Sequence, residues 1–139
     1  MIVRETWEGH MSGEITGGCK CGRVRYSGVP AQTEMFRCHC RDCQQLTGTG
    51  HADMVPLDAA TFVIDDGCKV FAMQGGSGRL TFSGFCPHCG SQLTRRSERV
   101  AGNVYVHAGS LDDPSSYLPK KSIYIESAQP WDHDMVVRE

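Results

Sequence analysis

The stretch Cys86-Pro87-His88-Cys89-Gly90 decides how this sequence folds, because it is typical of a zinc knuckle. Two thiolates separated by two residues lie inside a tight turn, where backbone amides can hydrogen-bond to the sulfurs. Gly90 supplies the backbone freedom that such a turn needs. A knuckle offers only two ligands, so it requires a second pair, and Cys19-Lys20-Cys21-Gly22 supplies one. The two pairs together predict a structural zinc site with four ligands: Cys19, Cys21, Cys86 and Cys89.

A second cluster, Cys38-His39-Cys40-Arg41-Asp42-Cys43, places three thiols within six residues. Cys38, Cys40 and Cys43 can reach one ion and leave its fourth position open, which is the arrangement of a catalytic zinc. Three thiolates make the metal a weaker Lewis acid and favour a fourth sulfur, which would lose its proton on binding. The trio therefore predicts a second, catalytic zinc that handles thiols, and a total of two Zn²⁺.

Other residues can complete the second site and make both metals structural. Cys68 is one candidate, although it lies alone at the start of an alternating run, and we favour a role for it in core packing. His39 is flanked by two ligands, and neighbours in an extended stretch point opposite ways, so it is not expected to reach the same ion. His51 follows Gly48-Thr49-Gly50 and is the histidine we expect near the site.

Three polar residues flank the trio, namely Arg37, Arg41 and Gln44. They can orient a thiol that carries carboxylates, but for each of them we favour a surface or supporting role.

Composition limits the class of protein. The chain has 139 residues, a formal net charge of -2, 22% charged and 40% hydrophobic residues, which suit one folded domain. The absence of a basic stripe argues against nucleic-acid binding. No apolar run has the length of a membrane span, and the N-terminus lacks a secretory core, so we interpret the protein as cytoplasmic and without a membrane partner. In that reducing compartment, clustered cysteines more often bind metal than form disulfides.

The pattern along the chain predicts an all-β fold with short helical turns. Apolar and polar residues alternate in five runs, which predicts strands with one buried face: 23–26, 69–73, 79–83, 103–107 and 122–125. A short helix is expected at 41–46 and a helical turn at 58–60. We expect one zinc-binding domain over residues 14–135. Residues 1–13 are expected to be a flexible or partly vector-derived tail, because Gly9-His10-Met11 resembles a cloning junction.

The motifs together resemble the glutathione-dependent formaldehyde-activating enzyme family, which also includes centromere protein V. Over about residues 14 to 132, the resemblance rests on Gly18-Cys19-Lys20-Cys21-Gly22, Cys38-His39-Cys40-Arg41-Asp42-Cys43, Phe85-Cys86-Pro87-His88-Cys89-Gly90-Ser91, Ala108-Gly109-Ser110-Leu111-Asp112-Asp113-Pro114 and Gln129-Pro130-Trp131. It implies zinc-binding sheets of the β-tent type and the same division of cysteines between a structural and a catalytic zinc. It also implies a carbon–sulfur lyase that joins glutathione to formaldehyde as S-hydroxymethylglutathione.

One departure affects the expected substrate. Family members often carry basic residues just after the third cysteine of the trio, whereas this chain has the neutral pair Gln44-Gln45. The partners we expect are a small thiol such as glutathione and an aldehyde.

Two hypotheses for the function follow. The first is a zinc-dependent carbon–sulfur lyase-type enzyme acting on a thiol–aldehyde adduct. The second is a non-catalytic zinc module that recognises protein or nucleic acid, with both metals structural. Three ligands rather than four favour the enzyme.

Overall fold

The computed structural model describes residues 13–132. The expected tail, residues 1–13, therefore lies outside the described residues except for Gly13, as do the last residues of the expected domain 14–135. The described chain is mostly β-sheet, with strands β1 (Ile15–Gly18), β2 (Arg25–Gly28), β3 (Phe36–Cys38), β4 (Ala52–Asp58), β5 (Val63–Ile64), β6 (Lys69–Gln74), β7 (Leu80–Phe85), β8 (Gln92–Ser97), β9 (Asn103–His107) and β10 (Lys121–Ile123). Between them lie the α-helix α2 (Arg41–Thr47) and the short 3-10 helices η1 (Glu98–Val100), η2 (Ala108–Ser110), η3 (Pro114–Ser116) and η4 (Ile125–Ser127). The predicted all-β class is confirmed.

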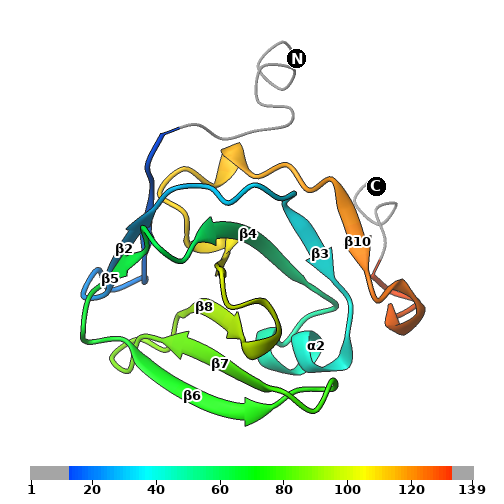
Figure 1. The fold of residues 1–139 in the computed structure, drawn as a ribbon. Helices are drawn as coiled ribbons and strands as arrows, with labels where there is room; N and C mark the ends of the chain where they lie inside the picture. Colours follow the sequence, from blue (N-terminus) through cyan, green and yellow to red (C-terminus); the bar gives the residue numbers. More distant parts are fainter. Residues whose placement is uncertain (1–12, 133–139) are drawn as a thin grey trace.

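The strands form two sheets. The smaller has the order β1-β2-β5, and the larger has seven strands in the order β10-β3-β4-β9-β8-β7-β6. All pairings are antiparallel except that of β10 with β3. The larger sheet is strongly curved, so that β6, β7 and β8 lie below β3 and β4 in Figure 1. Helix α2 lies at the end where these two halves approach each other.

Several expected elements form close to their predicted bounds. The runs at 69–73, 79–83 and 103–107 become β6, β7 and β9, and the expected helix becomes α2. The helical turn expected at 58–60 forms one residue later, as a hydrogen-bonded turn at 59–61, because Asp58 ends β4. The carbonyl of Asp58 accepts a hydrogen bond from the Thr61 amide, and its side chain accepts one from the Ala60 amide. The run at 122–125 is cut short because Tyr124 adopts a left-handed φ of 56°.

Two apolar clusters stabilise the fold. The larger joins the two sheets, and its fully buried side chains include Val24 before β2, Leu57 on β4 and Val106 on β9. The smaller lies beside α2 and contains Cys38, Cys43, Ala52 and Met54. Burial of such side chains contributes about 1.5–3 kcal/mol each. The second cluster therefore holds two cysteines of the trio in fixed positions.

Candidate metal centre

Two turns bring Cys19, Cys21, Cys86 and Cys89 together, with their sulfurs all within 4.8 Å of one another. The sulfurs of Cys21 and Cys86 are 3.8 Å apart, and those of Cys19 and Cys21 are 3.6 Å apart. Four sulfurs around a zinc at 2.3 Å would be separated by about 3.8 Å, so the group fits a tetrahedral ion. Figure 1 shows the hairpin of β7 and β8 that carries the second pair.

Each turn is stabilised in the same way. Gly22 and Gly90 follow the cysteine pairs with φ values of 83° and 80°, which a side chain would strain. The backbone amide of Val24 donates to the sulfur of Cys19, and that of His88 donates to Cys86. Hydrogen bonds from the side chain and backbone of Ser91 lower the pKa of Cys89 to about 5. The turns thus favour the thiolate form that a metal requires.

The trio Cys38, Cys40 and Cys43 forms a separate group within 4.8 Å. Cys38 ends β3, Cys40 is the N-cap of α2 and accepts a hydrogen bond from the Cys43 amide, and Cys43 lies in the first turn of the helix. Hydrogen bonds from Cys38 and then Cys43 lower the pKa of Cys40 to about 2. Among residues 13–132, no further Cys, His, Asp or Glu ligand atom joins this group. The two cysteine groups can each bind a metal ion.

The three cysteines of the trio open into a cavity of about 420 Å³. Much of its wall is apolar or aromatic, including Phe36, Met54 and Tyr105. The charged residues of the lining are Arg95, Arg96, Arg99 and Asp42. Tyr124, which has a left-handed φ of 56°, also contributes to the wall and is half exposed. An apolar cavity with a few polar groups and a potential metal site is suited to binding a small molecule.

Arg95 lies close to the trio. Its Nη1 lies 3.9 Å from the sulfur of Cys43, and its Nε is buried without a hydrogen-bond partner. The adjacent Arg96 also lines the cavity, and its guanidinium lies 5.7 Å from the ring centroid of Phe62. Arg95 was not predicted as a site residue, because an Arg-Arg pair in a sequence does not indicate what either side chain faces.

Gln44 is buried and fully engaged in contacts within the protein. Its Nε2 donates to the carbonyl oxygens of His39 and Ser127, and its Oε1 accepts from Arg41 and Gln129. The segment after β10 is thereby held against α2. Arg37 likewise donates to Asp53. Gln44 and Arg41 thus support the site through contacts with other protein groups.

The remaining candidate ligands lie elsewhere. Cys68 packs against the larger apolar cluster and belongs to neither cysteine group. The rings of His39 and His51 are packed together, with centroids 5.3 Å apart, and both contact Asp132. Asp132 was missed because it lies 81 residues from His51 in sequence. A glycine, Gly50, permits its approach, since a Cβ there would lie 2.5 Å from the Asp132 carboxyl carbon.

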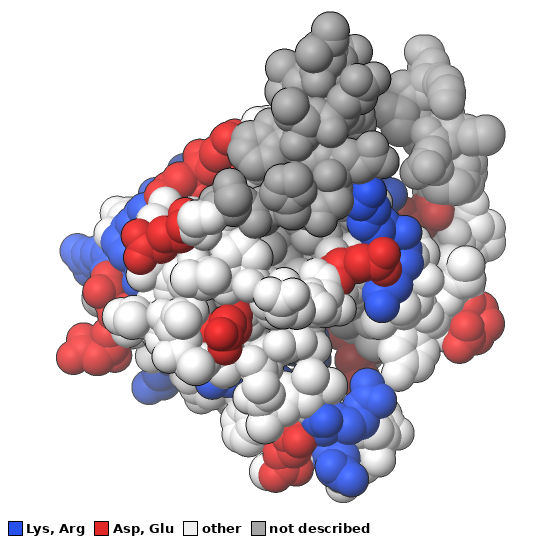
Figure 2. Space-filling model, turned by 45° about the horizontal axis from the view of Figure 1, so that its top comes forward, with Lys and Arg blue, Asp and Glu red and all other residues white. Residues whose placement is uncertain are grey.

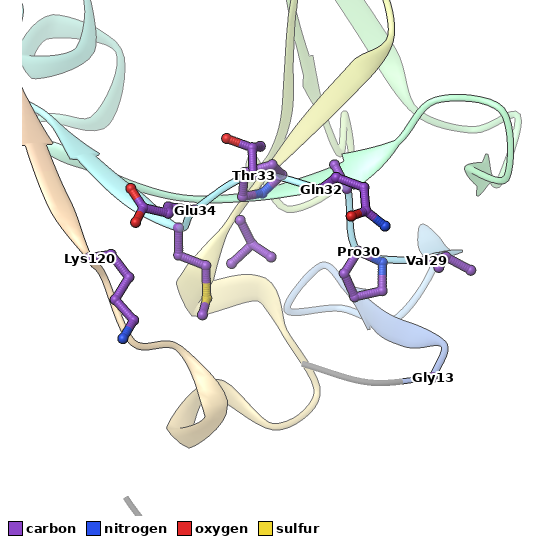
Figure 3. Close-up of a pocket in the computed structure, with 11 residues that line it drawn as sticks. Gly13, Val29, Pro30, Gln32, Thr33, Glu34 and Lys120 are labelled. Carbon is purple, nitrogen blue, oxygen red and sulfur yellow. The ribbon is translucent and has the colours of Figure 1, made fainter. Parts of the chain in front are cut away.

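Other surface features do not point to a site of this kind. A cavity of about 630 Å³ lies between residues 29–35, Val55, Pro56 and Lys120, and its described lining includes no cysteine or histidine. Figure 3 shows its labelled charged groups, Glu34 and Lys120, on separate segments. On the face shown in Figure 2, basic and acidic side chains are interspersed. No helix in the described part of the chain is long and apolar enough to cross a membrane.

Comparison with known proteins identifies the class. The family model described as glutathione-dependent formaldehyde-activating enzyme matches residues 14–127, most of the chain. This chain belongs to that family. No curated protein matches it. A crystal structure of a Rhodobacter sphaeroides protein has a similar fold, with a TM-score of 0.60 and 17% identity over 77% of this chain and 98% of the other. The family supports a formaldehyde-activating function, and the cysteine groups are consistent with its use of metal.

Proposed function

We propose that this chain is a zinc-dependent carbon–sulfur lyase-type enzyme that joins a small anionic thiol, such as glutathione, to formaldehyde. In this proposal Cys38, Cys40 and Cys43 hold a catalytic zinc, and Cys19, Cys21, Cys86 and Cys89 hold a structural zinc. The observation that carries the proposal is the position of the trio, which offers three ligands and borders a cavity of about 420 Å³. Membership of the formaldehyde-activating family supports it.

The reaction needs only one proton transfer. A bond forms between the thiol sulfur and the carbonyl carbon, the carbonyl π bond becomes a C–O single bond, and the thiol proton ends on that oxygen. When bound, zinc with an open fourth position supplies a Lewis-acidic centre that lowers the pKa of an incoming thiol. The thiolate rather than the thiol is the nucleophile, so this shift accelerates addition.

The protein's own residues bind and orient the substrate. Arg95 and Arg99 supply positive charge at the cavity for the carboxylates of an anionic thiol. The apolar wall around Phe36 and Met54 excludes water from the reacting carbon, which strengthens these charge interactions. The trio is followed by the neutral Gln44, but the cavity still has a cation beside Cys43, because β8 supplies Arg95.

The alternative function, a non-catalytic zinc module, has less support. A structural zinc is closed by four protein ligands, whereas the trio has three among residues 13–132. The face in Figure 2 also mixes both signs of charge, which does not favour a nucleic acid.

The test measures adduct formation directly. Isotope-labelled formaldehyde is mixed with glutathione, and the rate of exchange between free aldehyde and adduct is followed by NMR with and without zinc-loaded protein. We expect a rate above the spontaneous one, abolished in Cys40→Ser and retained in the matched control Cys68→Ser. A spontaneous rate for wild-type protein that carries two zinc ions would reject the proposed activity. Repeating the assay with glutathione diethyl ester tests the role of the carboxylates.

A further inference from the structure

A third group of potential metal ligands is separate from the two cysteine groups. It consists of His39, His51 and Asp132, whose ligand atoms all lie within 4.8 Å of one another. His39 is 8% exposed, and the other two side chains are also largely buried, at 17% and 15% exposed. These residues come from the β3–α2 connection, from the residue before β4, and from the end of the described chain. The fold therefore assembles this group from three separate segments.

The contacts converge on one atom. The Oδ2 of Asp132 lies 2.8 Å from Nδ1 of His51 and 3.3 Å from Nδ1 of His39. The Nδ1 of His39 is buried and makes no hydrogen bond. A buried imidazole nitrogen without a partner is costly, and its closest charged neighbour is the carboxylate that His51 already contacts. An ion shared by all three residues would satisfy this nitrogen.

The spacing agrees with a first-row transition metal. Ligand atoms bound at about 2.0–2.1 Å in a tetrahedral site are separated by roughly 3.3–3.4 Å. The distance from His39 to Asp132 already has this value, and the distance from His51 to Asp132 is a few tenths of an ångström shorter. Two imidazoles and one carboxylate form a donor set that binds divalent ions such as Zn²⁺, Co²⁺ or Fe²⁺.

The second ring nitrogen of His51, Nε2, contacts a carboxylate, as the outer nitrogen of a metal-bound histidine commonly does. Its Nε2 lies 3.0 Å from Oδ2 of Asp53. Asp53 is held in turn by Arg37 and by the hydroxyl of Tyr117, at 2.8 and 2.9 Å. A carboxylate that accepts the far N–H of a ligating histidine fixes the tautomer that leaves Nδ1 free to bind metal, and it raises the basicity of the ring.

We propose that His39, His51 and Asp132 form a third metal site, for a divalent first-row transition ion, separate from the two cysteine groups. It differs from them in chemistry because it offers nitrogen and oxygen and no sulfur. Three protein ligands leave further coordination positions for solvent or a small ligand. The site also ties the chain beyond η4 to the segment that carries Cys38 and Cys40. It does not depend on the activity proposed above.

The test is a cobalt titration of protein that already contains two zinc ions in its cysteine groups. We expect one additional equivalent of Co²⁺ to bind, with visible d–d bands and no growth of sulfur-to-cobalt charge-transfer bands. Asp132→Asn and His51→Gln should weaken this binding by at least about tenfold, and Asp53→Asn by about 10–100-fold. Asp66→Asn, on an exposed turn, is the matched control and should bind as wild type does.

A second variant tests geometry without removing a ligand. Gly50→Ala places a methyl group against the Asp132 carboxylate, so it should also lose the third ion, whereas Gly102→Ala has open space and should keep it. Zinc content and circular dichroism show whether each variant is folded. The absence of a saturable third equivalent would overturn the proposal. Wild-type binding by folded Gly50→Ala and Asp132→Asn would do the same, as would new charge-transfer bands.

Discussion

The Nη1 of Arg95 lies 3.9 Å from the sulfur of Cys43, although the two residues are 52 positions apart in sequence. This places a permanent positive charge beside the proposed thiol site. Hydrogen bonds to charged groups contribute about 1.5–3 kcal/mol. We therefore expect Arg95→Met to raise KM for glutathione by about 10–100-fold.

The matched control for this variant is Arg96→Met. It removes the same charge from the same strand and from the same cavity, but from a guanidinium that lies over the ring of Phe62. We expect Arg96→Met to leave KM within about twofold and to lose only the ~0.5–1 kcal/mol of the cation–π contact from stability. Steady-state kinetics with glutathione and with a neutral thiol separate the effects. A KM increase for both thiols in Arg95→Met would point to a distorted cavity instead of a lost charge.

The two cysteine groups should differ in their effect on stability. Cys86 is fully buried, packs in the larger apolar cluster and joins the two turns of the four-cysteine group. Losing one ligand there removes several kcal/mol of metal-derived folding energy, so Cys86→Ser should lower Tm by more than about 10 °C or prevent folding. Cys40→Ser should fold, lose the second metal and show a smaller decrease. Equal decreases in calorimetry would contradict the separate structural and catalytic roles.

Cys68 should be dispensable for metal binding, because it lies in neither group and packs against the larger cluster. We expect Cys68→Ala to retain two zinc ions by elemental analysis and to lose about 1 kcal/mol of stability from reduced packing. A fall to one zinc would show that Cys68 is a ligand and would favour the non-catalytic hypothesis.

Gln44 gives a test of the neutral residue that directly follows the trio. An arginine there has no acceptor for the hydrogen bonds that Arg41 and Gln129 donate to Gln44, and it would bury a charge beside Arg41. We expect Gln44→Arg to lower the free energy of unfolding by about 2–4 kcal/mol, measured by urea denaturation, without tighter glutathione binding. Gln45→Arg, at the exposed neighbour, should be tolerated. A stable Gln44→Arg protein with a lower KM would contradict the supporting role of Gln44.

His107 makes stability depend on pH. Burial, and then the charge of Arg95, lower its pKa to about 4 from an ordinary value near 6.5. Between these values the unfolded chain binds a proton that the folded protein does not, so the free energy of unfolding falls as pH decreases through this window, by at most about 3 kcal/mol. Comparing wild type with His107→Leu at about pH 7 and about pH 5 isolates this effect. We expect wild type to lose more stability than the variant on acidification; equal losses would count against it.

The cysteine groups could be anticipated because each pair or trio is local in sequence and thiol spacing reports metal chemistry directly. Strand β4 could not be anticipated from alternation. Met54, Val55 and Leu57 are all buried, so the strand lacks a polar face, and Pro56 further obscures it. Asp132 was missed for a different reason. It is 81 positions from His51 in sequence, and the two side chains come into contact only through the tertiary fold. Metal-binding groups that are local in sequence could be predicted, whereas contacts between residues distant in sequence required the structure.

The separation of Cys21 and Cys86 by 65 positions has a consequence for biosynthesis. The trio is complete as soon as six consecutive residues have left the ribosome, so it can take up metal while most of the sheet is still being translated. The four-cysteine group cannot close until the β7–β8 hairpin emerges, and its assembly carries the entropic cost of a long loop. A nascent chain stalled before Cys86 would therefore carry metal only at the trio, and the second ion would enter as the last strands of the large sheet are added.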